Sequence, residues 1–168
     1  GRQLVRYALL STGNYNPRTA RLYTDLSYLT ADARLTADMD QVFVHIASQS
    51  RLPRMNRLLL APFSLHRQLI ARIDALGKAA AQGQSTRIVV KMNALTDEPL
   101  IRALIAAGQR GVPIDLIVRG ACMLPAGVPG QTENIRVRSV IGRFLEHSRV
   151  FYFRCGEEET LLLASADW

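Results

Sequence analysis

Between residues 58 and 120, short apolar runs alternate with amphipathic stretches, and this alternation restricts the possible folds more than any other feature of the sequence. An apolar stripe at helical spacing predicts a helix that begins at Leu65, with Ser64 as its N-cap. Acidic residues at the start and a glycine at the end predict a second helix over 97–111. The apolar runs predict buried strands over 58–63, 87–93 and 113–120. The order strand, helix, strand, helix, strand predicts an α/β fold with a parallel sheet covered on both faces.

The chain before residue 58 follows a different pattern. Residues 3–10 are typical of a strand, and a turn-rich polar stretch follows them. Apolar residues then recur at helical spacing, and Thr30 is the predicted N-cap of that helix. The segment 51–57 is basic, contains proline and lacks periodicity. We therefore predict a linker over 51–57 between a first domain of residues 1–50 and a second domain of residues 58–168.

Glycine and proline interrupt the alternation after residue 120. Residues 134–140 alternate between apolar and polar types, which predicts a strand with one face in water. The apolar runs 149–154 and 160–165 are joined by a short polar segment and predict a β-hairpin.

The composition indicates an anionic partner. The 21 lysines and arginines exceed the 14 acidic residues and give a net charge of +7, which suits a nucleotide, a nucleic acid, a phosphate polymer or an acidic membrane. Aromatic residues make up only 7% and are not interleaved with basic ones, which argues against specific nucleic-acid binding. Two cysteines are too few for a disulfide framework or a zinc cluster, so we expect a cytoplasmic protein, with membrane association left open. Because the chain begins without methionine or a signal peptide, we interpret it as a piece of a longer protein.

Polar residues end two of the predicted parallel strands. Lys91 and Asn93 end one strand, and Arg119 ends the next. Ligands of open α/β sheets bind beyond the carboxyl ends of the strands, so these side chains are expected to face one crevice. An arginine at the end of a buried strand also requires an anion or a carboxylate as its partner.

The predicted hairpin contributes further polar residues. His147 and Arg149 lie at the start of its first strand, and Ser165 and Asp167 lie at or just after the end of its second. Antiparallel pairing brings these two ends together, so the four side chains are expected to form one cluster. A weak internal similarity between the two ends of the chain gives Asn14 the place in the first domain that Asp167 has in the second.

Six stretches resemble, in order, bacterial polyphosphate kinases of the large, phospholipase-D-like type, and the resemblance covers nearly the whole chain. They are TGNYNPRTARLYTDLSYLTAD, KMNAL, DLIVRG, TENIRVRS, GRFLEHSR and SADW. The phospholipase D pattern is His-x-Lys with Gly-Ser-x-Asn, and here it reads His-x-Arg and Ser-x-Asp. The resemblance implies a phospholipase-D-like mixed sheet flanked by helices. Residues 1–50 would then be the C-terminal end of a first catalytic domain, and residues 58–168 a nearly complete second one.

In that family the terminal phosphoryl group of ATP passes reversibly to polyphosphate through a histidine, which the resemblance places upstream of this chain together with the residues linked to Mg²⁺. The chain is therefore expected to hold no metal ligand and to be inactive alone. The resemblance implies that Tyr23 contacts ATP and that Arg119 binds phosphate. It also implies that His147 acts beside the transferring phosphoryl group, as a general acid or base or as a hydrogen-bond donor. The predicted ATP- and phosphate-binding residues are Asn14, Tyr23, Lys91, Asn93, Arg119, His147, Arg149, Ser165 and Asp167. The implied partners are ATP, ADP and inorganic polyphosphate, bound by a homo-oligomer.

One position departs from the family, and two other functions stay open. Leu9 stands where the family has a histidine before Gly-Thr-Gly-Asn, and leucine can neither accept a proton nor bind phosphate. The first alternative is a phospholipase-D-like phosphodiesterase or nuclease, which uses water as the acceptor. Arg149 in place of lysine and the absence of Gly-Ser-x-Asn count against it. The second is a non-catalytic polyanion-binding module with steep salt dependence and no preference for ATP.

Overall fold

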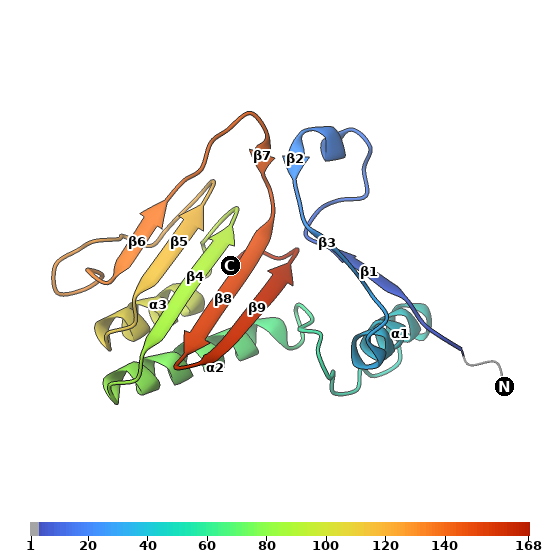
Figure 1. Cartoon of the computed structure of the whole chain (residues 1–168), viewed down its shortest axis with the longest axis horizontal. Coiled ribbons are helices and arrows are strands. Elements are labelled where there is room, and N and C mark those ends of the chain that lie inside the picture. Colours follow the sequence, from blue (N-terminus) through green and yellow to red (C-terminus); the bar gives the residue numbers. More distant parts are fainter. Residues whose placement is uncertain (1–3) are drawn as a thin grey trace.

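The computed structural model describes residues 4–168 and contains two parts joined by a linker (Figure 1). The N-terminal part consists of β1 (Ala8–Ser11), the 3-10 helix η1 (Thr19–Arg21), β2 (Tyr23–Thr24), β3 (Ser27–Thr30) and α1 (Ala33–Ser48). The C-terminal part consists of α2 (Leu65–Ala81), β4 (Thr86–Met92), α3 (Glu98–Gln109), β5 (Ile114–Val118), β6 (Ile135–Arg138), β7 (Leu145–Glu146), β8 (Arg149–Cys155) and β9 (Glu158–Ala164).

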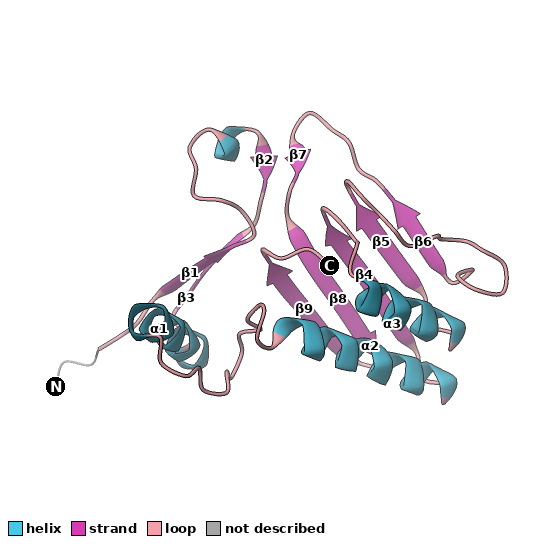
Figure 2. Ribbon diagram, turned by 180° about the vertical axis from the view of Figure 1, so that it is seen from behind, coloured by secondary structure: helices cyan, strands magenta, loops and turns pink. Residues whose placement is uncertain are grey.

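A five-stranded mixed sheet forms the centre of the C-terminal part, in the order β6-β5-β4-β8-β9. Strand β5 is parallel to β4 and β6, whereas β8 is antiparallel to β4 and to β9. Helices α2 and α3 lie side by side over the same face of this sheet (Figure 2). The mixed sheet flanked by helices is therefore confirmed. The prediction of a parallel sheet with both faces covered is wrong, because α2 does not cross between two strands and the hairpin adds antiparallel pairs.

The predicted strand over 58–63 does not form, and a carboxylate of α1 binds the backbone where the run begins. The side chain of Asp38 is 2% exposed and accepts hydrogen bonds from the backbone amides of Asn56, Arg57 and Leu58 at 2.6 to 2.9 Å. Within the run 58–63, the amide of Leu58 is bound by this carboxylate and that of Leu60 by the hydroxyl of Ser64, so neither is offered to a neighbouring strand. An apolar run is therefore fixed as a loop against α1.

The predicted cap of α1 is wrong, and the predicted cap of α2 is in the N-cap position but makes no capping bond with its side chain. Helix α1 is capped by Asp32, whose carboxylate accepts from two amides of the first turn at 2.9 and 3.0 Å. Thr30, the predicted cap, ends β3, and its hydroxyl accepts from the amide of Asp32. Ser64 does precede α2, but its hydroxyl oxygen accepts from the amide of Leu60 at 3.0 Å and caps no amide of the helix.

The first strand is shorter than predicted. Strand β1 begins at Ala8 and pairs antiparallel with β3, whereas residues 4–7 are not in a strand and residue 3 of the predicted range 3–10 lies outside the described residues. Leu9 lies opposite Leu29 in this pair, and both side chains are exposed. The leucine at the family's histidine position therefore lies beside another apolar side chain.

The core fills the space between the sheet and the two helices. Alternate residues of β4, β5 and β8 face the helices and are buried, as a strand with one covered face requires. The ring of Trp168, at the end of the chain, packs edge-on against Phe151 with ring centroids 4.9 Å apart. The most deeply buried side chains include Leu69, Ile73, Ile88, Val90, Leu104, Leu116 and Phe151.

A short parallel ladder joins the two parts of the chain. Strand β2 pairs with β7, with Tyr23 opposite Leu145 and Thr24 opposite Glu146. The amide of Leu145 donates to the carbonyl of Leu22 at 2.7 Å, and the amide of Ser148 donates to the carbonyl of Thr24 at 3.0 Å. Figure 1 shows this junction beyond the upper ends of β4, β8 and β9. It places residues 22–25 beside the start of β8, where the predicted site residues lie.

Candidate active site

Asn93 connects residues at the adjoining ends of four strands, β4, β5, β8 and β9. It follows β4, and its side-chain oxygen accepts from Nε of Arg119, which follows β5, at 2.9 Å. The amide of Asn93 donates to Oδ1 of Asp167 at 2.7 Å, and its side-chain nitrogen donates to the carbonyl of His147 at 3.3 Å. The carboxyl-end rule thus places Asn93 and Arg119 together, as expected.

Arg149 and Asp167 form a two-point ion pair across the hairpin. Nε and Nη2 of Arg149 donate to the two carboxylate oxygens of Asp167 at 3.2 and 2.9 Å. Burial alone would raise the pKa of Asp167, but the guanidinium and the amides of Asn93 and Ala94 outweigh it and lower the pKa of this carboxyl. Asp167 is therefore a fixed negative charge at neutral pH, and it holds Arg149 in one orientation.

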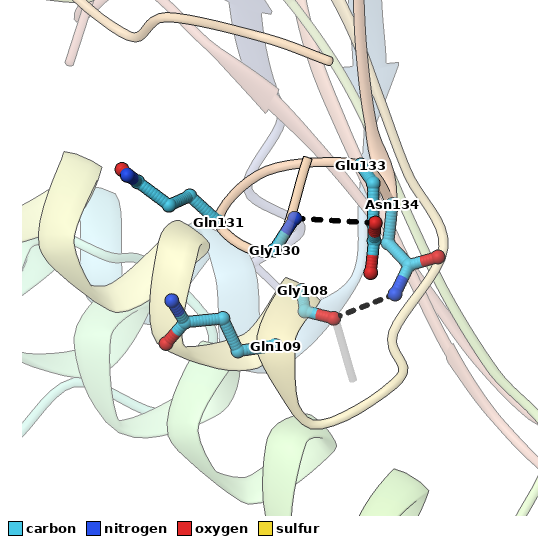
Figure 3. Close-up of a pocket in the computed structure, with 6 residues that line it drawn as sticks. All are labelled: Gly108, Gln109, Gly130, Gln131, Glu133 and Asn134. Atoms are coloured by element: carbon cyan, nitrogen blue, oxygen red, sulfur yellow. Dashed lines mark hydrogen bonds between the residues drawn. The ribbon is translucent and has the colours of Figure 1, made fainter. Parts of the chain in front are cut away.

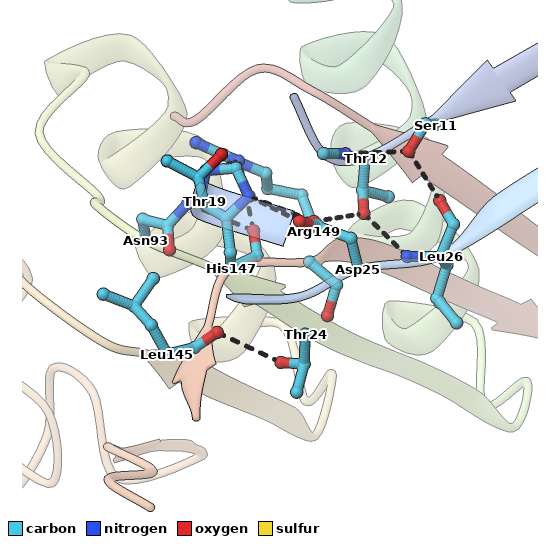
Figure 4. A network of polar contacts seen from close by, with 12 residues as sticks. Ser11, Thr12, Thr19, Thr24, Asp25, Leu26, Asn93, Leu145, His147 and Arg149 are labelled. Atoms are coloured by element: carbon cyan, nitrogen blue, oxygen red, sulfur yellow. Dashed lines mark hydrogen bonds and ion pairs between the residues drawn. The ribbon is translucent and has the colours of Figure 1, made fainter. Parts of the chain in front are cut away.

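His147 lies between a carboxylate and a guanidinium (Figure 4). Its Nδ1 lies 3.0 Å from Oδ1 of Asp25, and its Nε2 lies 3.0 Å from Nη1 of Arg149. Nη1 also lies 3.5 Å from Nδ1 and donates to the carbonyl of His147 at 3.1 Å, so the guanidinium lies against the ring and helps to hold it beside Asp25. The side chain of His147 is 12% exposed, which leaves the ring little freedom to turn.

Asp25 is a site residue that the sequence analysis did not identify. Besides His147, Asp25 accepts from the hydroxyl of Thr12 at 2.8 Å, and that hydroxyl accepts from the amide of Leu26 (Figure 4). The one available signal was its place two residues after Tyr23, within a stretch that resembles the family. The spacing of residues in the sequence could not show that this stretch contacts the second domain.

Tyr23 and Lys91 both lie next to this network. The ring of Tyr23 is tilted by 36° against the ring of His147, with centroids 4.6 Å apart. Nζ of Lys91 donates to the carbonyl and the hydroxyl of Ser148 at 2.9 and 2.7 Å and lies 3.3 Å from Oε2 of Glu146. Lys91 is therefore engaged at the junction and does not contact Arg119 within the described residues.

Two predicted residues lie outside the network. Ser165 and Asn14 are exposed, and neither side chain hydrogen-bonds to a group that the structure describes. The expected cluster of four hairpin residues thus forms without Ser165. The binding roles of all nine predicted residues stay predictions.

A small hollow at the other end of the sheet contributes no residue to this site. Figure 3 shows a hollow of about 230 Å³ between the end of α3 and the start of β6, at the opposite ends of the strands. The side chain of Asn134 closes one side of it by donating to the carbonyl of Gly108 at 2.9 Å. Across residues 4–168, no three histidine, cysteine or acidic side chains are grouped so that they could hold a metal ion.

None of the helices that the structure describes combines the length and the apolar composition needed to cross a bilayer.

Comparison with known proteins gives one consistent family. Residues 58–168 match the model for polyphosphate kinase C-terminal domain 2, and residues 1–52 match the model for polyphosphate kinase C-terminal domain 1. The chain is 52% identical over 166 residues to a polyphosphate kinase of Pseudomonas aeruginosa, covering 99% of this chain and 24% of that protein. It is 51% identical over 168 residues to a polyphosphate kinase of Xylella fastidiosa, covering 100% and 24%.

A solved structure agrees with these sequences. The crystal structure of polyphosphate kinase from Porphyromonas gingivalis superimposes with a TM-score of 0.91 and 36% identity, covering 100% of this chain and 28% of that one. The chain therefore spans about a quarter of the length of the curated relatives that it matches.

Proposed function

The chain belongs to the polyphosphate kinase family, and from this premise we propose that it supplies one half of the active site of an ATP:polyphosphate phosphotransferase. The observation that carries the proposal is the position of His147 between Asp25 and Arg149, in a network that ends at Arg119. Because the chain spans about a quarter of its relatives, the activity of the whole protein and its substrates, ATP and polyphosphate, belong to the proposal.

The charges of the site suit a phosphoryl group in transit. Nε of Arg119 is engaged with Asn93, whereas its two terminal nitrogens hydrogen-bond to no group within the described residues. A guanidinium fork matches two oxygens of one phosphate, so Arg119 can bind phosphate without breaking the network. Phosphoryl transfer depends mainly on positioning and on neutralising charge, and this arrangement provides both.

His147 is proposed to move a proton and not to carry the phosphoryl group. Asp25 holds Nδ1, which leaves Nε2 of His147 to exchange a proton with an oxygen of the phosphoryl group. Asp25 at Nδ1 orients the ring for this step, as a carboxylate behind a catalytic histidine does in hydrolases. The nucleophilic histidine of the family is expected outside this chain. Tyr23, beside His147, is proposed to contact ATP.

The magnesium ion that the family implies does not fit the carboxylates of this site. Asp25 is engaged with His147, and Asp167 forms the two-point pair with Arg149. We therefore expect any Mg²⁺ ligands outside this chain. Assembly into a homo-oligomer also stays a prediction.

The test replaces His147 and Arg119, one at a time, in a full-length polyphosphate kinase that contains this sequence. His147→Ala and Arg119→Ala are each expected to slow transfer from ATP to polyphosphate by at least about a hundredfold, the usual scale for a general acid or base. Formation of polyphosphate is measured, and thermal unfolding checks that each variant is folded. Arg102→Ala, which removes an exposed charge on α3, serves as the control and should keep the rate.

Wild-type rates in either variant would remove that residue from the site. Hydrolysis of a phosphodiester without any nucleotide requirement would instead favour the phosphodiesterase alternative.

A further inference from the structure

We propose that the linker and the start of α2 form a second phosphate-binding site, separate from the network around His147, which binds the condensed chain of inorganic polyphosphate. We call the site the linker hollow. Its position and charge come from the structure alone, and the choice of polyphosphate as the ligand rests on the proposed function.

The linker hollow has the size of a ligand site. Its volume is about 900 Å³, within the range of about 300–1,000 Å³ that small-molecule sites occupy. It lies where the linker passes between α1 and α2. The residues that line it are His45, Gln49, Ser50, Arg51, Leu52, Pro53, Arg54, Met55, Asn56, Leu60, Phe63, Ser64, Arg67 and Gln68.

The charge of the linker hollow has one sign. Three arginines line it, Arg51, Arg54 and Arg67, and its lining contains neither aspartate nor glutamate. Within the described residues, none of these guanidinium groups forms a hydrogen bond or an ion pair, whereas other exposed arginines do pair with acids, namely Arg34, Arg87, Arg102, Arg110 and Arg138. Like charges gathered in one hollow repel one another and attract an anion, and guanidinium groups favour phosphate.

The walls of the linker hollow are formed in advance. The buried carboxylate of Asp38 holds the linker through Asn56 and the two residues after it. On the other side, Nδ1 of His45 contacts the carbonyl of Ser50. The ring of His45 lies edge-on to the ring of Phe63, with ring centroids 5.6 Å apart. A site with fixed walls loses little entropy when a ligand binds. The four hydrogen bonds of Asp38 all go to Asn56, Arg57 and Leu58, and within the described residues it forms no ion pair with the three arginines of the linker hollow.

The linker hollow lies away from the candidate active site. None of the residues in the His147 network lines it. In Figures 1 and 2 the linker runs beside α1 and the start of α2, whereas the network lies at the β2–β7 junction. A chain substrate with many phosphates can reach two such sites at once, whereas ATP has only three phosphates. The linker hollow is therefore expected to affect binding of polyphosphate and not binding of ATP.

Isothermal titration calorimetry of the chain with inorganic polyphosphate, ATP and orthophosphate, each alone, tests the proposal. The variant Arg51→Ala/Arg54→Ala/Arg67→Ala removes the three charges of the linker hollow. We expect its Kd for polyphosphate to rise at least about tenfold, which corresponds to the loss of one good charge-assisted contact, with its Kd for ATP unchanged.

The control variant Arg34→Ala/Lys78→Ala/Arg102→Ala removes the same number of charges from exposed helix positions with only surface ion pairs. It should bind polyphosphate within about twofold of the wild type, because such pairs contribute little. Equal weakening in both variants would show that only net charge matters and would overturn the proposal. An unchanged Kd in the linker-hollow variant, a loss of ATP binding in it, or equal competition by single-stranded DNA would also overturn it.

This outcome is separable from the proposed function. Binding is measured without turnover, so normal phosphotransfer by His147→Ala would refute the catalytic role and leave the linker-hollow result unaffected.

Discussion

Gly13 lies against the carboxylate of Asp25, and this contact gives the glycine a role at the scale of single residues. A Cβ atom at position 13 would lie 2.3 Å from Oδ2 of Asp25. The backbone of Gly13 is not in the left-handed region that only glycine adopts readily, so its lack of a side chain is needed for space. Gly13 is therefore a positioning residue: it lets Asp25 reach His147.

A double-mutant cycle tests this role in a full-length polyphosphate kinase that contains this sequence. Asp25→Asn and Gly13→Ala are each expected to lower kcat about tenfold or more with little change in KM for ATP, because both disturb the partner that orients His147. The double variant should be no worse than Asp25→Asn alone, since both changes break the same contact.

Gly142→Ala is the matched control, because a Cβ there would meet nothing within 4 Å. Additive losses in kcat, or a loss in the Gly142 variant of the same size, would contradict the role given to Gly13.

The sequence predicted the residues that the strand ends and the hairpin bring together, and it failed where distant segments meet. Asn93 and Arg119 follow neighbouring parallel strands, and Arg149 and Asp167 face each other across the hairpin, so the order of elements determined their contacts. Asp25 reaches the site through the β2–β7 ladder, which joins segments about 120 residues apart and leaves no periodic signal. Local patterns do not encode such a contact.

At the scale of elements, Asp38 decides the conformation of the linker. Burial alone would raise the pKa of Asp38, but the amides of Asn56, Arg57 and Leu58 and the side chain of Asn56 outweigh it and lower the pKa. The apolar run 58–63 has the composition of a strand, and the prediction failed because the amide of Leu58 is bound by this carboxylate and that of Leu60 by the hydroxyl of Ser64.

Asp38→Asn is expected to lower the free energy of unfolding by about 2 kcal/mol at pH 7, since hydrogen bonds to a charged group contribute about 1.5–3 kcal/mol each. The new NH₂ group would face amide donors and cannot accept from them. Because the folded pKa lies below the unfolded value of about 3.9, this contribution is complete above that value and is lost as the pH falls through the folded pKa.

Urea unfolding at pH 7 and at pH 3 measures this difference. The difference in the free energy of unfolding between wild type and Asp38→Asn should be smaller at pH 3 than at pH 7. Asp40→Asn, on the same helix but half exposed, with its nearest arginine nitrogen 3.8 Å away, is the control and should change stability little. A gap that stays constant from pH 7 to pH 3 would show that the charge of Asp38 does not hold the linker.

At the scale of the whole molecule, Lys91 connects the sheet to the N-terminal part. Its ammonium group contacts Glu146 on β7, and the same carboxylate accepts from the hydroxyl of Thr24 on β2 at 3.2 Å. The chain Lys91, Glu146, Thr24 thus spans the junction that brings Asp25 to His147. Lys91 had been predicted to bind phosphate, and its contacts now favour a structural role at this junction.

Lys91→Met tests these two roles against each other by hydrogen exchange. If Lys91 stabilises the junction, the amides of Leu145 and Ser148, which donate to the carbonyls of Leu22 and Thr24, should exchange faster in the variant. Amides in the centres of β4 and β5 should keep their rates, because their ladder is not involved. Lys78→Met, which removes an exposed lysine paired only with Asp74, is the control and should leave exchange at the junction unchanged. Unchanged exchange together with weaker binding of ATP would instead assign Lys91 to the phosphate, and the two parts of the chain would then depend on the β2–β7 ladder and the Asp25–His147 pair.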